Sequence, residues 1–191
     1  MSEILILARV RINELDLPVV TDYYFDVKEK LAGVPGCYGL SVWRDEVDAE
    51  AFLVIYEYAD LDAAERGLVA LTEIRVLAET QAADFRPADV QRIRVGDFGG
   101  YRMSEVSPRA DLSVSHRVAD PGYGPELLAE TEQIMTELAL MPGYLGSVYG
   151  INDALEEEVL GLVAWSSREA FVASLPPHAT MRTITVYSRF Y

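Results

Sequence analysis

The chain has 191 residues, half of them apolar, which suits a globular protein of one large domain or two small ones. Acidic residues outnumber basic ones by 31 to 16, so the net charge of −15 argues against nucleic acids and anionic membrane surfaces as partners. The single cysteine, Cys37, and the lack of a recognisable signal peptide or transmembrane stretch predict a cytoplasmic protein without an internal disulfide.

The first 98 residues carry the signals of four strands and two helices. Apolar residues recur at three- and four-residue spacing from Val20 to Leu31, as on one face of a helix, and Pro35-Gly36 then stops that helix. Runs rich in β-branched and aromatic residues predict the strands. The expected strands cover 4–11, 38–44, 52–58 and 90–95, and the expected helices cover 17–31 and 61–83.

The second part of the chain repeats this order. After a Gly- and Pro-punctuated linker at 99–110, strands are expected at 112–118, 144–151, 159–165 and 181–190, with helices at 125–138 and 167–175. Pro35-Gly36 recurs as Pro142-Gly143, and the shift of 142 − 35 = 107 residues also pairs Tyr58 with Trp165. A repeat of this length indicates a duplicated domain rather than a solenoid.

The order strand, helix, strand, strand, helix, strand is the ferredoxin-like pattern. The sequence therefore predicts an α+β protein of two fused ferredoxin-like (βαββαβ) domains, 1–98 and 111–191, joined by the linker 99–110. Each antiparallel sheet has helices on one face only, so we expect the two sheets to pack into one α/β-barrel within the chain, an intramolecular pseudo-dimer. A monomeric barrel and a homodimer of barrels both remain open.

Three segments resemble a known family: Val34-Pro-Gly-Cys-Tyr-Gly39, Met141-Pro-Gly-Tyr-Leu-Gly146 and Trp165-Ser-Ser-Arg-Glu-Ala-Phe171. They are similar to the antibiotic biosynthesis monooxygenase (ABM) family of the dimeric α/β-barrel superfamily, as a tandem fusion. That superfamily includes cofactor-free oxygenases of aromatic polyketides, polyketide cyclases, haem-degrading enzymes and isomerases. The resemblance implies a small aromatic substrate, with molecular oxygen as a second substrate for an oxygenase. Haem degraders carry a ligand histidine on the helix after the tryptophan, and this helix has none, which disfavours haem breakdown.

Cofactor-free oxygenation needs a group that takes a proton from the substrate and an apolar pocket that orients it. The second half supplies more suitable side chains than the first, so we expect the pocket there, on the helix-covered face of its sheet. The candidates for catalytic residues are His116, Tyr149 and Trp165. The candidates for substrate-binding residues, which include the first-half counterparts of His116 and Trp165, are His178, Tyr58, Arg9 and Ser115.

Simpler interpretations stand beside these roles. His116 and His178 could be structural or loop histidines, Trp165 and Tyr58 could be core aromatics, and the acidic run 156–158 is expected to be a solvated turn. Strand alternation places His116 on the face of Leu112 and Val114, without saying which face that is. If His116 faces away from the pocket, Ser115 and Arg117 take its place there.

Neither a metal nor an organic cofactor is expected. The chain has no Cys or His cluster with metal-ligand spacing, no phosphate loop and no dinucleotide-binding glycine motif in the right context. Three functions remain: a cofactor-independent monooxygenase acting on an aromatic polyketide-type molecule of secondary metabolism, a polyketide cyclase or isomerase of the same fold, and a non-catalytic ligand-binding barrel.

Overall fold

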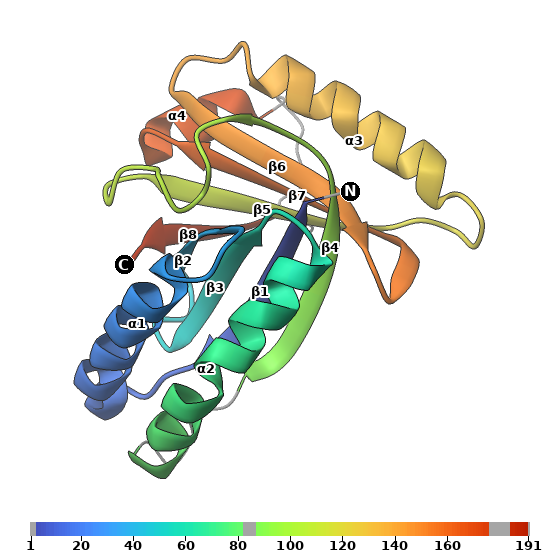
Figure 1. Ribbon diagram of the computed structural model, residues 1–191. Coiled ribbons are helices and arrows are strands. Elements are labelled where there is room, and N and C mark those ends of the chain that lie inside the picture. The colour runs from blue at the N-terminus through green and yellow to red at the C-terminus, as the bar shows by residue number, and fades with distance from the viewer. Residues whose placement is uncertain (1–2, 82–86, 176–183, 191) are drawn as a thin grey trace.

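The computed structural model describes residues 3–81, 87–175 and 184–190, which form a closed, eight-stranded antiparallel barrel with helices on its outside (Figure 1). The first half contributes β1 (Ile4–Arg11), a short 3-10 helix (Glu14–Asp16), α1 (Leu17–Ala32), β2 (Cys37–Asp45), β3 (Ala51–Tyr58), α2 (Leu61–Gln81) and β4 (Pro87–Gly100). The second half contributes β5 (Asp111–Val118), α3 (Gly124–Leu138), β6 (Tyr144–Asn152), β7 (Leu155–Trp165), α4 (Arg168–Ser174) and β8 (Ile184–Arg189).

The barrel consists of two ferredoxin-like sheets joined along their edges. The strand order β1-β3-β2-β8-β5-β7-β6-β4 contains the sheets β4-β1-β3-β2 and β8-β5-β7-β6. One seam pairs β4 with β6 from Ile93 to Gly100, and the other pairs β2 with β8 over Trp43 to Asp45. The predicted α+β class, with two fused βαββαβ units in one barrel, is confirmed. Among the described strands no sheet edge is left exposed, because each edge strand pairs with the other half.

The two Pro-Gly turns have the conformation that their sequence favours. Gly36 and Gly143 have φ angles of +82° and +84°, a left-handed backbone that glycine adopts without the steric penalty of a Cβ. Each turn lets a helix end and the next strand begin within a few residues. β4 is longer than expected and ends at Gly100, two residues inside the expected linker, because it pairs with β6 along this length.

The barrel interior is a packed apolar core rather than a channel. Equivalent residues of the two halves meet there, among them Leu5, Leu7, Leu112 and Val114. Met103, on the segment between β4 and β5, packs against the same core. Side chains thus fill the interior, as expected for a barrel of eight strands. Space for a ligand has to be found on the outer, helix-covered faces.

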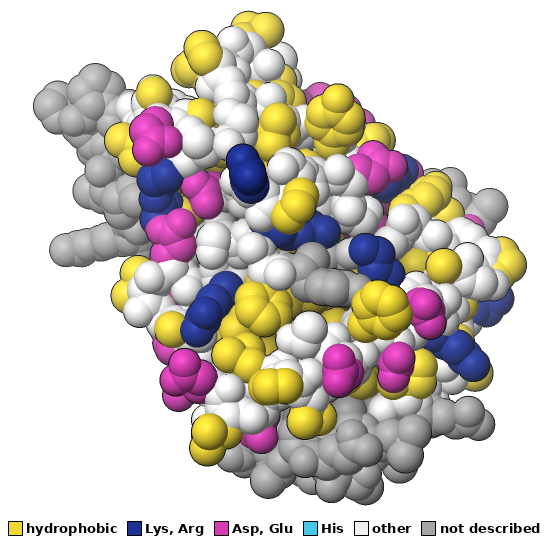
Figure 2. Space-filling model, turned by 90° about the vertical axis from the view of Figure 1, so that its left-hand side faces the viewer, with side chains coloured by type: hydrophobic (Ala, Val, Ile, Leu, Met, Phe, Trp, Pro, Cys, Tyr) yellow, Lys and Arg dark blue, Asp and Glu magenta, His cyan; other side chains and the backbone are white. Residues whose placement is uncertain are grey.

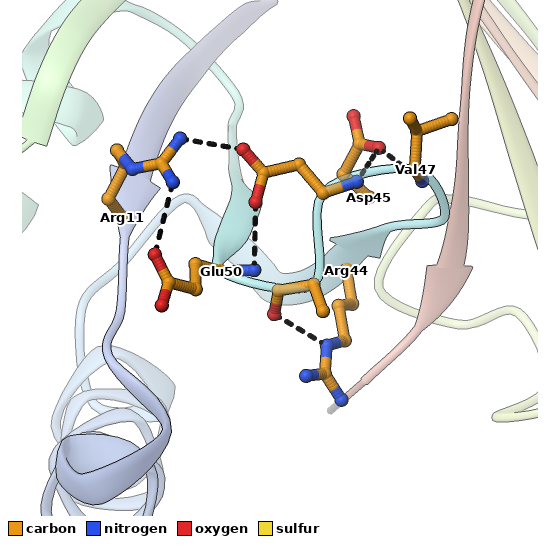
Figure 3. Close-up of polar contacts among 7 residues, drawn as sticks. Arg11, Arg44, Asp45, Val47 and Glu50 are labelled. Carbon is orange, nitrogen blue, oxygen red and sulfur yellow. Dashed lines mark hydrogen bonds and ion pairs between the residues drawn. The ribbon is translucent and has the colours of Figure 1, made fainter.

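Short-range polar contacts fix the turn between β2 and β3 (Figure 3). The Asp45 carboxylate accepts hydrogen bonds from the backbone N–H groups of Val47 (2.7 Å) and Asp48 (3.0 Å). Arg11, at the end of β1, bridges the carboxylates of Asp48 (2.6 Å) and Glu50 (3.1 Å). This exposed cluster ties the turn to the neighbouring strand and is a structural use of charge.

The surface mixes charges of both signs. On the face that carries the segment after β4 and the C-terminal strand, Lys and Arg side chains are interspersed with Asp and Glu and with apolar groups (Figure 2). The net charge of −15 is therefore not gathered into one acidic patch on this face. Among the described helices, none combines the length and the apolar character needed to cross a membrane.

Candidate functional site

A cavity lies in the second half, between the outer face of the sheet and the helices α3 and α4. Its volume is about 240 Å³, slightly below the lower bound of about 300 Å³ that is usual for ligand pockets, which favours a compact ligand. Strand residues form the floor and α3 and α4 form the walls. A cavity on the helix-covered face of the second sheet was the sequence-based expectation, and it is confirmed. The apolar lining includes Ile134, Met135, Leu138, Val163, Trp165 and Phe171.

Strand alternation decides which polar residues reach this cavity. On β5, Ser113, Ser115 and Arg117 line it, whereas Leu112 and Val114 point into the barrel core. Successive side chains of a strand point to opposite faces, so His116 belongs to the barrel side. The placement of His116 in the helix-side pocket is therefore wrong, and Ser115 and Arg117 take the pocket-facing positions.

His116 instead belongs to a polar cluster at one end of the barrel, where its side chain is 44% exposed. Its Nε2 contacts the carboxylate of Glu158, whose side chain is only 7% exposed. The same carboxylate accepts hydrogen bonds from Gln91 Nε2 (2.8 Å) and from Asn152 Nδ2. The residues 156–158 lie on β7, so the predicted turn is wrong, and the predicted exposure is wrong for Glu158, which is buried. A buried carboxylate with several donors is well satisfied and serves the fold.

Arg117 is the charged group of the cavity lining. Its Nη2 binds the Glu130 carboxylate of α3 at 2.9 Å. The other terminal nitrogen, Nη1, is buried and has no hydrogen-bond partner among the described residues. An unsatisfied buried donor on a charged group is unfavourable, typically by about 1–3 kcal/mol or more. A ligand with an anionic oxygen would relieve this cost.

Trp165 forms one wall of the cavity and is fixed in place by its neighbours. Its Nε1 donates to Ser113 Oγ (3.0 Å), and its ring lies against those of Tyr144 and Phe171. Ser115 Oγ lies 3.4 Å from the Gly161 carbonyl, to which it donates. Trp165 and Ser115 thus line the cavity, while their roles in catalysis and substrate binding stay predictions.

Gly161 and the α3 residues of the lining were not among the predicted site residues. A Cβ on Gly161 would come within 3.0 Å of Met135 and of Ser115 Oγ, so glycine here leaves room for the cavity and for the approach of α3. A glycine inside a strand is a known signal of such a close approach. The strand pairing sets Gly161 directly opposite Ser115, and the sequence does not reveal that register.

The remaining predicted residues are spread over the molecule. Tyr149 lies on the helix side of β6 next to Gly96, and burial, followed by the nearby Glu132, raises the pKa of its hydroxyl. Tyr58 lines a separate cavity in the first half. Arg9 binds Asp89 (2.6 Å) and Gln91 (2.8 Å), and alternation sets it on the barrel side with Leu5 and Leu7. It does not line either cavity. His178 lies outside the described residues.

No group of three or more His, Cys, Asp or Glu residues in the described part of the chain could hold a metal ion. Of the described residues that line the second-half cavity, Arg117 is the one ionisable side chain. The cavity can therefore bind an apolar ring system and stabilise negative charge at one point. It offers hydroxyl groups, but among these residues no side chain that titrates near neutral pH.

No family model and no curated protein matches the sequence. Solved structures do match over the whole chain. A proposed monooxygenase from Fusobacterium nucleatum aligns with 100% of this chain and 93% of its own, with a TM-score of 0.80 and 14% identity. A proposed monooxygenase from Lactobacillus acidophilus aligns with 99% of this chain and 94% of its own, with a TM-score of 0.75 and 12% identity. An anthrone oxidase-like protein aligns with 100% of this chain and 92% of its own, with a TM-score of 0.67 and 15% identity.

At such low identities these matches establish a shared fold. The fold is that of ferredoxin-like proteins related to antibiotic biosynthesis monooxygenases, and the resemblance seen in the sequence is confirmed at this level. The same fold occurs in a proposed chlorite dismutase and in a heme-degrading enzyme from Listeria monocytogenes, with TM-scores of 0.60 and 0.53. Because one fold carries several reactions, the function has to be argued from the cavity.

Proposed function

We propose that the protein is a cofactor-independent, monooxygenase-like enzyme that takes an acidic aromatic molecule of the polyketide type into the second-half cavity. The observation that carries this proposal is Arg117, a guanidinium in an apolar cavity with one buried N–H group left without a partner. A phenolate or enolate oxygen satisfies such a donor, because the hydrogen bond between a guanidinium and an anionic oxygen is charge-assisted.

The proposed reaction uses the substrate as its own electron source. Bound beside Arg117, an anthrone or phenol gives its proton to water more readily, because the guanidinium stabilises the enolate or phenolate. In an anthrone, one oxygen atom of molecular oxygen then replaces the two methylene hydrogens as a carbonyl. The other oxygen atom leaves with both hydrogens as water. Four electrons pass from carbon to oxygen, so no external reductant is needed.

The roles of the other cavity residues follow from this chemistry. Trp165 and Phe171 form apolar walls against which a ring system packs. The Ser115 hydroxyl lies on the same strand face as Arg117 and can reorient to bind a second oxygen of the substrate. Excluding water from this cavity strengthens the interaction between Arg117 and the substrate anion.

The test is oxygen uptake and quinone formation with anthrone as the probe. Arg117→Met keeps an unbranched, flexible side chain and removes its charge, and we expect kcat/KM to fall by about a hundredfold or more. Arg11→Met, on an exposed arginine that binds Asp48 and Glu50, is the matched control and should leave turnover unchanged. His116→Ala should change turnover far less than Arg117→Met. Equal activity of Arg117→Met and the parent protein would refute the proposal.

A non-catalytic ligand-binding barrel is the second candidate, because the described cavity lining contains no general base. Binding of an aromatic carboxylate that depends on Arg117, without oxygen uptake from anthrone, would favour it. The cyclase or isomerase alternative needs an acid and a base in contact with the substrate, and it would show as turnover of a polyketide-type probe in the absence of oxygen.

A further inference from the structure

The first half contains a second cavity at the position equivalent to the one already described. Its volume is about 190 Å³, and it lies between the sheet of the first half and α2. The shift of 107 residues relates part of the two linings: Ala8 corresponds to Ser115, and Tyr58 corresponds to Trp165. The duplication has thus kept a hollow in each half, although side chains fill the barrel between them.

The two cavities differ in charge. Arg117 corresponds to Val10, a buried apolar residue, and its partner Glu130 corresponds to Tyr23. The first-half counterparts of the ion pair therefore carry no charge, and no charged side chain is among the described residues that line this cavity. Burying an ionised ligand without a compensating charge is strongly unfavourable. The first cavity consequently disfavours the anions that suit the second one.

In the first cavity the polar groups of the described lining are hydroxyls, those of Tyr23, Tyr56, Tyr58 and Thr72, and the Thr72 hydroxyl donates to the Leu68 carbonyl at 3.2 Å. Tyr56 and Tyr58 both line it, and burial is the main cause that raises the pKa of each, so both stay neutral hydrogen-bond donors at physiological pH. The ring of Tyr58 lies against Gly67 of α2, where a Cβ would be only 2.6 Å from its hydroxyl oxygen. The glycine lets the tyrosine lie between the sheet and the helix.

We propose that the first-half cavity is a second small-molecule site, which takes an uncharged, compact, apolar ligand with a carbonyl oxygen. The carbonyl accepts a hydrogen bond from a tyrosine hydroxyl, and the apolar part fills the space beside Ile6, Ala8 and Leu71. The two halves thus bind ligands of different charge. The sites act independently, because each lies on the outer face of its own sheet with its own helices (Figure 1).

A matched pair of probes tests this: fluorenone, which is uncharged and carries one carbonyl, and fluorenone carboxylate, which has the same rings and a negative charge. Isothermal titration calorimetry is done on the full chain and on two variants at equivalent positions. Ala8→Leu fills the first cavity and should weaken fluorenone binding by at least about tenfold while leaving the carboxylate unaffected. Ser115→Leu fills the second cavity and should have the opposite effect.

Tyr56→Phe provides a second measurement, because it conserves volume and removes only the hydroxyl. If Tyr56 is the donor, fluorenone affinity falls about 3- to 10-fold and carboxylate affinity is unchanged. If the change is absent in Tyr56→Phe, the corresponding loss must appear in Tyr58→Phe or Tyr23→Phe. Lack of fluorenone binding, or its loss in Ser115→Leu instead of Ala8→Leu, would overturn the proposal. Neither readout involves oxygen uptake, so this proposal can fail or succeed separately from the proposed reaction.

Discussion

Replacing Gly143 by alanine should destabilise the protein more than the same change at Gly36 or Gly122. Gly143 has φ = +84°, and a Cβ at this position would lie closer than 3.0 Å to both Ala170 Cβ and Ser166 Oγ. Ala170 Cβ is attached directly to the backbone of α4, so it cannot move away by changing a rotamer. The turn or the start of α4 would have to shift.

The expected loss of stability has two parts, one from the backbone conformation and one from the close contact, and substitutions at other glycines distinguish them. A left-handed backbone costs an alanine about 1–2 kcal/mol, and an overpacked contact adds about 1–3 kcal/mol. Gly143→Ala should thus lower the free energy of unfolding by about 2–5 kcal/mol. Gly122 has φ = +85° and nothing within 4 Å of the new Cβ, so Gly122→Ala should show only the backbone part. Gly36, with Ala63 Cβ at 2.8 Å, should fall between them.

Denaturant unfolding followed by circular dichroism measures these differences at constant m-value. Gly33→Ala is the neutral reference, because Gly33 has φ = −88° and its nearest contact, the Lys30 carbonyl, is at 3.6 Å. It should leave stability unchanged or raise it by up to about 1 kcal/mol. If Gly143→Ala and Gly122→Ala lower the unfolding free energy equally, the contact with α4 has no energetic weight and the reasoning is refuted.

Three further predictions concern buried charge and cofactors. Glu158→Ala leaves the donors that meet the Glu158 carboxylate unpaired and should lower the free energy of unfolding by about 1–3 kcal/mol. The control is Glu156→Ala, on a side chain that is 80% exposed, which should change the free energy of unfolding by less than about 0.5 kcal/mol. Equal melting temperatures of the two variants would contradict this prediction. Burial raises the pKa of Glu57, so its contribution to stability is fully present below the unfolded pKa of about 4.3 and is lost as pH rises through the folded pKa. The free energy of unfolding of the parent protein, relative to that of Glu57→Gln, should therefore decrease as the pH rises above about 4.3 towards neutral. If this difference stays constant or increases with pH, the predicted direction of the effect is wrong. The purified, dialysed protein should lack the absorption bands of flavin and haem, and a persistent band in either region would reveal a cofactor site that the sequence does not signal.

The order of strands and helices could be predicted because each element leaves a local signal. The helical spacing from Val20 to Leu31 ends at Pro35-Gly36, and the structure has α1 over Leu17–Ala32 and β2 from Cys37. The repeat then extends the pattern to the second half. These signals depend on neighbours within a few residues along the chain, so they can be recognised without knowledge of the tertiary structure.

The face of β5 could not be predicted in the same way. Alternation groups Leu112, Val114 and His116 on one side, but both sides of this strand are covered, one by the barrel core and the other by helices. An apolar face therefore does not identify the helix side. Glu158 was missed for a related reason: its partner Gln91 is 67 residues away along the chain and reaches it across the seam between the two halves.

The differences between the halves on the helix side support two specialised cavities. In the barrel core, some equivalent positions stay aliphatic, as with Leu53 and Leu160 or Ile55 and Leu162, whereas Trp43 corresponds to Gly150 and the buried Glu57 to Ala164. On the helix side, Val10 corresponds to Arg117, which changes both charge and hydrogen bonding. A core shared by both halves restricts its residues, because any change of volume there strains the opposite sheet as well. The helix-covered faces are not shared, so each half of a fused chain can change its own cavity without disturbing the barrel.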